Sequence, residues 1–325
     1  MAELTFKQDS LLLREWLANT TSFWYSGDSE DNFKNNFDEI SPYFQKAYID
    51  YNWNSYGYRT PYDFDDLPSK FALCFGCSYT EGVGVGENDT WTARLEKNLG
   101  FACVNMGISG GSSDVIVANS RLWIQNRFRK PYAVFCQIPE VSREPRVYID
   151  KYRKENGFAS NTVVNPSWDL DPLHQNKQII ERRAKSQENI TSRYWVTSNN
   201  LSMMALAWQN WGVPVLFFTY DNDGDIIYHS HDVLRVTGDM MMTKNDDVDF
   251  ARDLAHNGYI TSENIAIALE HRFNEVEEWR NSDSIEPQPY SFGNTVWSDD
   301  ATEMEDYYRM LGMRLVKGRR PFIYE

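Results

Sequence analysis

The stretch FALCFGCSYTEGVGVGENDTW, residues 71–91, decides how the rest of the chain is interpreted. It opens with an apolar run that ends at a glycine, FALCFG, and Cys77 and Ser78 follow directly. A short, continuously apolar run that stops at turn-forming residues is typical of a strand buried on both faces. We therefore predict a strand over residues 71–76, with Ser78 just beyond its carboxyl end.

Short, continuously apolar runs of the same kind recur along the chain, with helical segments around them. Three more apolar runs predict buried strands, at residues 101–107, 132–138 and 213–220. Segments with helical spacing lie around them, at residues 89–100, 112–130, 201–211 and 262–273. Continuously apolar strands that alternate with helices indicate a parallel sheet covered on both faces. The expected fold class is α/β, a three-layer α/β/α sandwich around a parallel sheet of about five strands, in which functional groups gather at the carboxyl ends of strands.

Three segments do not follow this alternation of strands and helices. Residues 1–68 are rich in aromatic residues, Asn and Asp, with helical spacing near residues 37–51, and we expect them to form an extension that packs on the core. Within the α/β domain, residues 69–276, the polar segment 143–195 is interpreted as an insertion beside the site. Residues 277–325 are interpreted as a C-terminal extension.

Composition excludes several functional classes. Hydrophobic residues make up 42% of the 325 positions, which is enough for a large core. The formal net charge of −15 argues against nucleic acid or an anionic membrane as a partner. No run of apolar residues is long enough to span a bilayer. The opening MAELTFKQDSLLLREW lacks the basic and apolar regions of a secretion signal, so we expect cytoplasmic synthesis without a signal peptide.

The four cysteines lie in or beside apolar runs, where a free cysteine behaves as a small hydrophobic residue. They are Cys74, Cys77, Cys103 and Cys136. A zinc site built from Cys74-x-x-Cys77 and the other two is an alternative, but the spacing matches no ribbon or finger pattern. We expect neither a metal ion nor an organic cofactor.

A serine that acts as a nucleophile needs a base, a group that orients the base, and donors for the oxyanion that forms. In FARDLAHNGYITSENIAIAL, residues 250–269, Asp253 and His256 stand three positions apart before an Asn-Gly break. That spacing places two side chains on one side of a helical turn, so Asp253 could orient the imidazole toward Ser78. Taken alone, Ser78 could equally cap the helix that follows the first strand.

These motifs resemble those of the SGNH or GDSL hydrolases. The segment Gly76-Cys77-Ser78-Tyr79-Thr80-x-Gly82 resembles their first block, CVNMGISGGSSD at residues 103–114 their second, and Asp253-x-x-His256 their last. The resemblance covers residues 69–142 and 196–275. It implies a flavodoxin-like fold, with Ser78 as nucleophile, His256 as base and Asp253 as the orienting acid. It also implies an oxyanion hole formed by the backbone N–H groups of Ser78 and Gly110, with Gly107 as the next match.

Two departures from the family pattern stand out. Cys77 replaces the usual aspartate before the serine, a side chain that does not react. The family's third block, Gly-x-Asn-Asp after the third strand, is missing, so its oxyanion-hole asparagine is absent. Gln137, Ser142 and Arg143 are the candidates for a substitute donor, and Arg143 could alternatively bind the substrate.

The resulting hypothesis is a serine esterase that removes acyl groups, most readily acetyl, from a small molecule or a carbohydrate. The rival hypothesis is a non-catalytic carbohydrate-binding or structural module on a degenerate scaffold of the same kind. The Asn-, Asp- and Tyr-rich composition resembles that of bacteriophage proteins. Virion proteins or further copies of the chain are the macromolecular partners that this resemblance suggests, with association to a virion as the corresponding location.

Overall fold

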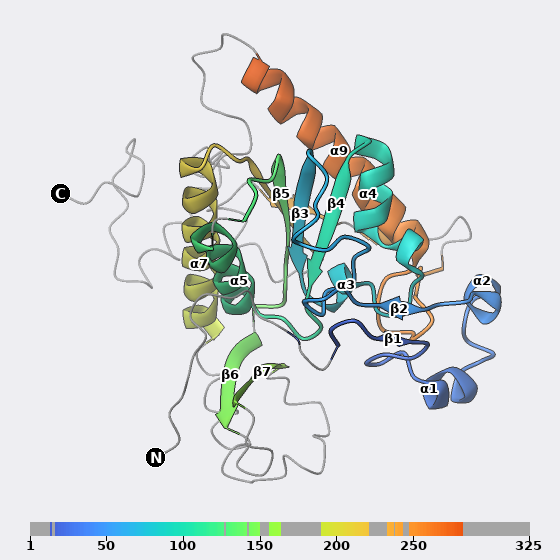
Figure 1. The fold of residues 1–325 in the computed structure, drawn as a ribbon. Coiled ribbons are helices and arrows are strands. Elements are labelled where there is room, and N and C mark those ends of the chain that lie inside the picture. Colours follow the sequence, from blue (N-terminus) through green and yellow to red (C-terminus); the bar gives the residue numbers. More distant parts are fainter. Residues whose placement is uncertain are drawn as a thin grey trace.

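A five-stranded parallel sheet forms the centre of the computed structural model, which describes residues 14, 17–126, 128–141, 143–149, 156–163, 190–220, 233–236, 238–242 and 247–281 (Figure 1). Its strands are β3 (Phe71–Gly76), β4 (Ala102–Gly107), β5 (Ala133–Ile138), β8 (Val215–Thr219) and β9 (Val233–Arg235). They lie in the order β4-β3-β5-β8-β9, and every neighbouring pair is parallel. The order reverses between β3 and β5, which is where doubly wound sheets place their sites. The predicted α/β/α sandwich is confirmed.

Helices cover both faces of the sheet, as Figure 1 shows: α5 (Ser113–Gln125) and α7 (Ile190–Asn210) on one side, α4 (Trp91–Leu99) and α9 (Tyr259–Asn281) on the other. Side chains of β3 alternate between the two, because successive residues of a strand point to opposite faces. Leu73 packs in the core with Trp123 of α5, whereas Cys74 packs in the core with Trp91 of α4. Burial on both faces explains why each strand is apolar throughout.

Several element boundaries differ from the sequence-based ones. Helix α7 begins at Ile190, inside the segment interpreted as an insertion, and α9 continues to Asn281, past the expected end of the domain. Within the insertion, β6 (Arg143–Ile149) and β7 (Asn156–Val163) form an antiparallel hairpin. Neither this hairpin nor β9 was predicted. Two short 3₁₀ helices lie elsewhere in the chain: η1 (Glu87–Asp89) precedes α4, and η4 (Gly238–Met241) lies between β9 and α9.

The N-terminal extension lies at the end of the sheet toward which β3 and β4 point (Figure 1). It contains a short antiparallel pair, β1 (Thr21–Ser22) with β2 (Tyr51–Asn52), and two helices, α1 (Glu30–Asn35) and α2 (Pro42–Lys46). Only α2 is helical within the segment 37–51, so that expected helix is much shorter than predicted, and it begins at a proline that suits a first helical position. No helix in the described part of the chain has the length and hydrophobicity needed to cross a membrane.

Candidate active site

A tight turn from β3 into the one-turn helix α3 (Ser78–Glu81) places Ser78 at the carboxyl end of the first strand of the sheet. A Cβ atom at Gly76 would lie 1.9 Å from Thr80 Oγ1, so only glycine allows the helix to fold back this closely. The chain then leaves α3 through Gly82 at φ +81°. Ser78 therefore stands at the point where the strand order reverses, with 7% of its surface exposed.

Three side chains from opposite ends of the fold meet at this point. The Oγ atom of Ser78 lies 2.7 Å from Nε2 of His256, and Nδ1 of His256 lies 2.5 Å from Oδ2 of Asp253. The His256 side chain is 15% exposed and that of Asp253 is fully buried. The structure thus brings together the three residues that the sequence singled out, in the order hydroxyl, imidazole, carboxylate.

Asp253 and His256 lie on a loop directly before α9, and the turn between them is not helical. Leu254 between them has φ +56°, and the second carboxylate oxygen of Asp253 accepts the backbone N–H groups of Ala255 and His256, each at 3.1 Å. Burial by itself raises the pKa of Asp253. The hydrogen bonds and charge of His256 and the two backbone donors outweigh it, so the pKa lies below the ordinary value.

Two of the predicted oxyanion donors have backbone N–H groups that are not engaged within the described part of the chain. Among the described residues, neither the N–H of Ser78 nor that of Gly110 donates a hydrogen bond. The loop that carries Gly110 lies against the turn after β3, because the N–H of Ile108 donates to the carbonyl of Gly76 at 3.0 Å. The prediction for Gly107 is wrong, since its N–H donates to Oδ1 of Asn105 at 2.9 Å.

The candidates for a third donor have different surroundings. Gln137 accepts the N–H of Cys77 at 2.9 Å and donates one N–H of its own Nε2 to the carbonyl of Ile138 at 2.9 Å, so its amide braces the turn after β3. Ser142 lies outside the described residues. Arg143 is buried, and its Nη1 donates to the carbonyl of Gly111 at 3.3 Å.

Arg143 also lies close enough to the side chain of Cys77 to interact with it, and its Nε lies 3.5 Å from the carboxylate of Glu140. Burial alone would lower the pKa of Arg143, but the groups of Cys77 and Glu140 raise it above the ordinary value. Its guanidinium is thus held between the neighbour of Ser78 and the neighbour of Gly110.

Sequence reasoning did not identify the buried polar groups that hold these loops. Glu81 at the end of α3 accepts the N–H and the hydroxyl of Ser109, at 2.7 and 2.5 Å, and pairs with Arg14 at 2.6 Å. Asn105 donates to the carbonyl of Thr80 at 2.7 Å. An asparagine inside the apolar run of β4 was a local signal for such a role, because a buried amide needs partners. Glu81 gave no such signal.

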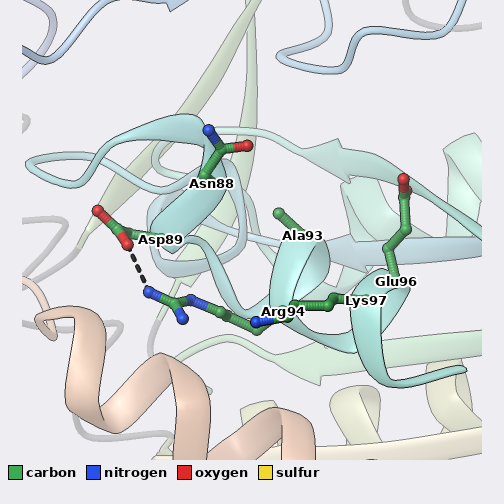
Figure 2. Close-up of a pocket in the computed structure, with 6 residues that line it drawn as sticks. All are labelled: Asn88, Asp89, Ala93, Arg94, Glu96 and Lys97. Atoms are coloured by element: carbon green, nitrogen blue, oxygen red, sulfur yellow. Dashed lines mark hydrogen bonds and ion pairs between the residues drawn. The ribbon is translucent and has the colours of Figure 1, made fainter. Parts of the chain in front are cut away.

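A surface hollow of about 390 Å³ lies away from these residues, on η1 and α4 (Figure 2). It is lined by polar and charged side chains apart from one alanine: Asn88, Asp89, Ala93, Arg94, Glu96 and Lys97. Arg94 pairs there with Asp89 at 2.6 Å. Within the described ranges, no group of three or more His, Cys, Asp or Glu residues is arranged to hold a metal ion.

No protein-family model and no curated protein matches the sequence. Among solved structures, a member of the lipolytic protein G-D-S-L family from Veillonella parvula DSM 2008 is similar at 13% identity, covering 63% of this chain and 99% of that one, with a TM-score of 0.38. An acetyl xylan esterase (Est2A) from Butyrivibrio proteoclasticus is 11% identical, with 66% and 65% covered and a TM-score of 0.38. A carbohydrate esterase family 2 enzyme with a carbohydrate-binding domain, from Corynascus thermopiles (Myceliophthora fergusii), is 10% identical, with 71% of each chain covered and a TM-score of 0.40. Sequence identities of 10–13% and TM-scores of 0.38–0.40 are too low to assign an activity to this chain.

Proposed function

We propose that this protein is a serine hydrolase that cleaves acyl esters through Ser78, His256 and Asp253. The observation that carries the proposal is the unbroken pair of short contacts, 2.7 Å from hydroxyl to imidazole and 2.5 Å from imidazole to carboxylate. In this arrangement the neutral imidazole accepts the serine proton as Oγ attacks the ester carbonyl. The imidazolium then gives that proton to the departing alcohol. Water, deprotonated by His256, releases the acid from the acyl-enzyme in the second half of the cycle.

The negative charge that develops on the carbonyl oxygen needs donors fixed in advance. The free N–H groups of Ser78 and Gly110 supply two. Arg143 is the candidate for a third because it already contacts Cys77 and Gly111, which flank those two groups. Loss of an oxyanion donor costs about 10²–10³-fold in kcat. We expect Arg143→Ala to show a kcat loss in that range with KM little changed, whereas a rise in KM alone would assign Arg143 to substrate binding.

Acetyl esters, including those of carbohydrates, are the proposed substrates. A largely buried Ser78 suits a small acyl group. The net charge of −15 suits a neutral substrate better than an anionic one. Two partly exposed aromatic side chains of the extension, Trp24 and Phe33, lie against the guanidinium of Arg252, next to Asp253, and are the rings that a carbohydrate substrate would contact.

The decisive experiment combines a small acetyl ester with a fluorophosphonate probe. We expect the wild-type protein to hydrolyse the ester and to be labelled at Ser78, and Ser78→Ala to lose at least about 10⁴-fold in kcat and all labelling at that position. Ser41→Ala, which removes an exposed serine without a side-chain cap bond, is the matched control and should retain wild-type turnover. Turnover that survives Ser78→Ala would overturn the assignment.

A non-catalytic module is the second candidate, and one observation favours it. No asparagine follows β5 directly, because the sequence from Gln137 to Arg143 reads QIPEVSR, so the family's oxyanion-hole asparagine has no counterpart there. Such a module would bind carbohydrate or take a structural place in a virion. A folded wild-type protein that the probe does not label would support this candidate.

A further inference from the structure

An aspartate of the N-terminal extension forms a two-pronged ion pair with the residue just before Asp253. Nε of Arg252 donates to Oδ1 of Asp28 at 2.7 Å, and Nη2 donates to Oδ2 at 2.6 Å. Both side chains are almost fully buried, at 6% and 1% exposure. Bidentate, charge-assisted pairs fix direction as well as distance. The base of the loop that carries Asp253 is therefore held at a defined angle.

This pair belongs to a closed ring of hydrogen bonds. The hydroxyl of Tyr51 donates to Oδ2 of Asp28 at 2.5 Å and accepts the N–H of Gly84 at 2.8 Å. The carbonyl of Gly84 in turn accepts the backbone N–H of Arg252 at 3.0 Å. The Arg252 guanidinium also lies over the ring of Trp24, at 4.3 Å. Because the ring closes on itself, displacement of Asp28 displaces the backbone at Arg252.

The extension also touches Asp253 directly. Nδ2 of Asn32 donates to the backbone carbonyl of Asp253 at 3.1 Å. Gly27 packs so closely that a Cβ atom there would lie 3.2 Å from Oδ2 of Asp253, the oxygen that contacts His256. The carboxylate is thus enclosed by the extension on one side and by its own turn on the other.

We propose that the N-terminal extension positions the acid of the site, and that Asp28 is the principal positioning residue, acting through Arg252. The inference rests on the proposed function. Asp28 touches no reacting group, so its loss should change the rate of the chemical step and not the affinity for substrate. Misplacement of a catalytic group by about 1 Å costs on the order of 10²-fold in rate.

Asp28→Asn is the test, and Asp89→Asn is a matched control from the hollow in Figure 2. Each aspartate pairs with one arginine and accepts one tyrosine hydroxyl: Asp28 with Arg252 and Tyr51, Asp89 with Arg94 and Tyr43. Both substitutions therefore remove a carboxylate charge that pairs with an arginine and a tyrosine hydroxyl, and they differ in that the Asp28 pair is bidentate and more deeply buried, at 1% against 15% exposure. We expect Asp28→Asn to lower kcat for an acetyl ester about 10- to 100-fold with KM within about twofold of wild type. Asp89→Asn should keep the wild-type kcat.

A second measurement does not depend on activity. The proton between His256 Nδ1 and Asp253 gives a downfield ¹H NMR signal when the contact is short. We expect that signal in the wild type and in Asp89→Asn, and its broadening or loss in Asp28→Asn. If the wild type neither turns over the ester nor reacts with the probe, the proposed function fails, while this signal still decides the positioning role.

Two results would overturn the inference: a wild-type kcat in folded Asp28→Asn, or an unchanged downfield signal. If Asp28→Asn does not fold, Asn32→Ala replaces it, with Asn36→Ala as its control. Both variants break the Asn36–Asn32 side-chain bond, but only Asn32→Ala removes the bond to the Asp253 carbonyl. A lower kcat and a weaker signal in Asn32→Ala alone support the positioning role, and equal behaviour of the two variants contradicts it.

Discussion

Asp253 is buried, yet its surroundings favour its charged form. Its pKa is lowered in the folded state relative to the ordinary value of 3.8, because His256 and two backbone N–H groups stabilise the carboxylate more than burial disfavours it. A carboxyl with a depressed folded-state pKa stabilises the fold above its unfolded-state pKa, and this contribution is lost as the pH falls through the folded-state value.

We therefore expect the wild type to be more stable than Asp253→Asn at about pH 5, and this advantage to shrink below about pH 4. Urea unfolding of both proteins at pH 7, 5, 4 and 3 measures it. An advantage that stays the same at pH 3 would mean that Asp253 is not stabilised as a carboxylate.

The three residues of the candidate triad were predictable because each carries a local signal. Ser78 follows an apolar run, and Asp253 and His256 stand close together before a helix. Asp28 and Arg252 carry none, because they pair across 224 positions and sit among ordinary polar residues. Gly107 was misassigned since the sequence does not show that Asn105 captures its N–H.

Helix α9 begins directly after the loop of His256, and a carboxylate from the preceding segment caps it. Oδ2 of Asp249 accepts the N–H of Thr261 in the first turn at 2.7 Å. Capping groups of this kind contribute about 0.5–2 kcal/mol. We expect Asp249→Ala to lower the free energy of unfolding by that amount, measured by urea denaturation, and Asn274→Ala, at an exposed position within α9, to leave it nearly unchanged. Equal effects would show that Asp249 is not a cap.

The continuously apolar strands were predictable from the sequence, whereas a very short strand and a polar hairpin were not. Strands β3, β4, β5 and β8 were visible because burial on both faces makes each an unbroken apolar run. Strand β9 has three residues, too few for any periodicity to show. The β6–β7 hairpin is polar and pairs only with itself, so no apolar face marked it.

The extension and the α/β domain share one core. Tyr58, Phe64 and Leu67 are buried in the same group of side chains as Phe71 of β3 and Trp123 of α5. A chain that begins at residue 69 would expose this apolar surface, and side chains of this size each contribute about 1.5–3 kcal/mol when buried. We expect that shortened chain to show no cooperative urea transition and no near-ultraviolet circular dichroism. A cooperative transition like that of the full chain would show that the domain folds alone.

The bond between Asp28 and Arg252 has a kinetic consequence, since it spans 224 positions of a 325-residue chain. Contacts between such distant positions form slowly, because a long loop must close before they contribute any energy. During synthesis, Asp28 cannot pair with Arg252 until most of the polypeptide has left the ribosome. We therefore expect the loop that carries Asp253 and His256 to be among the last parts of the protein to fold. A partly synthesised chain would contain Ser78 without the base and the acid of the proposed triad.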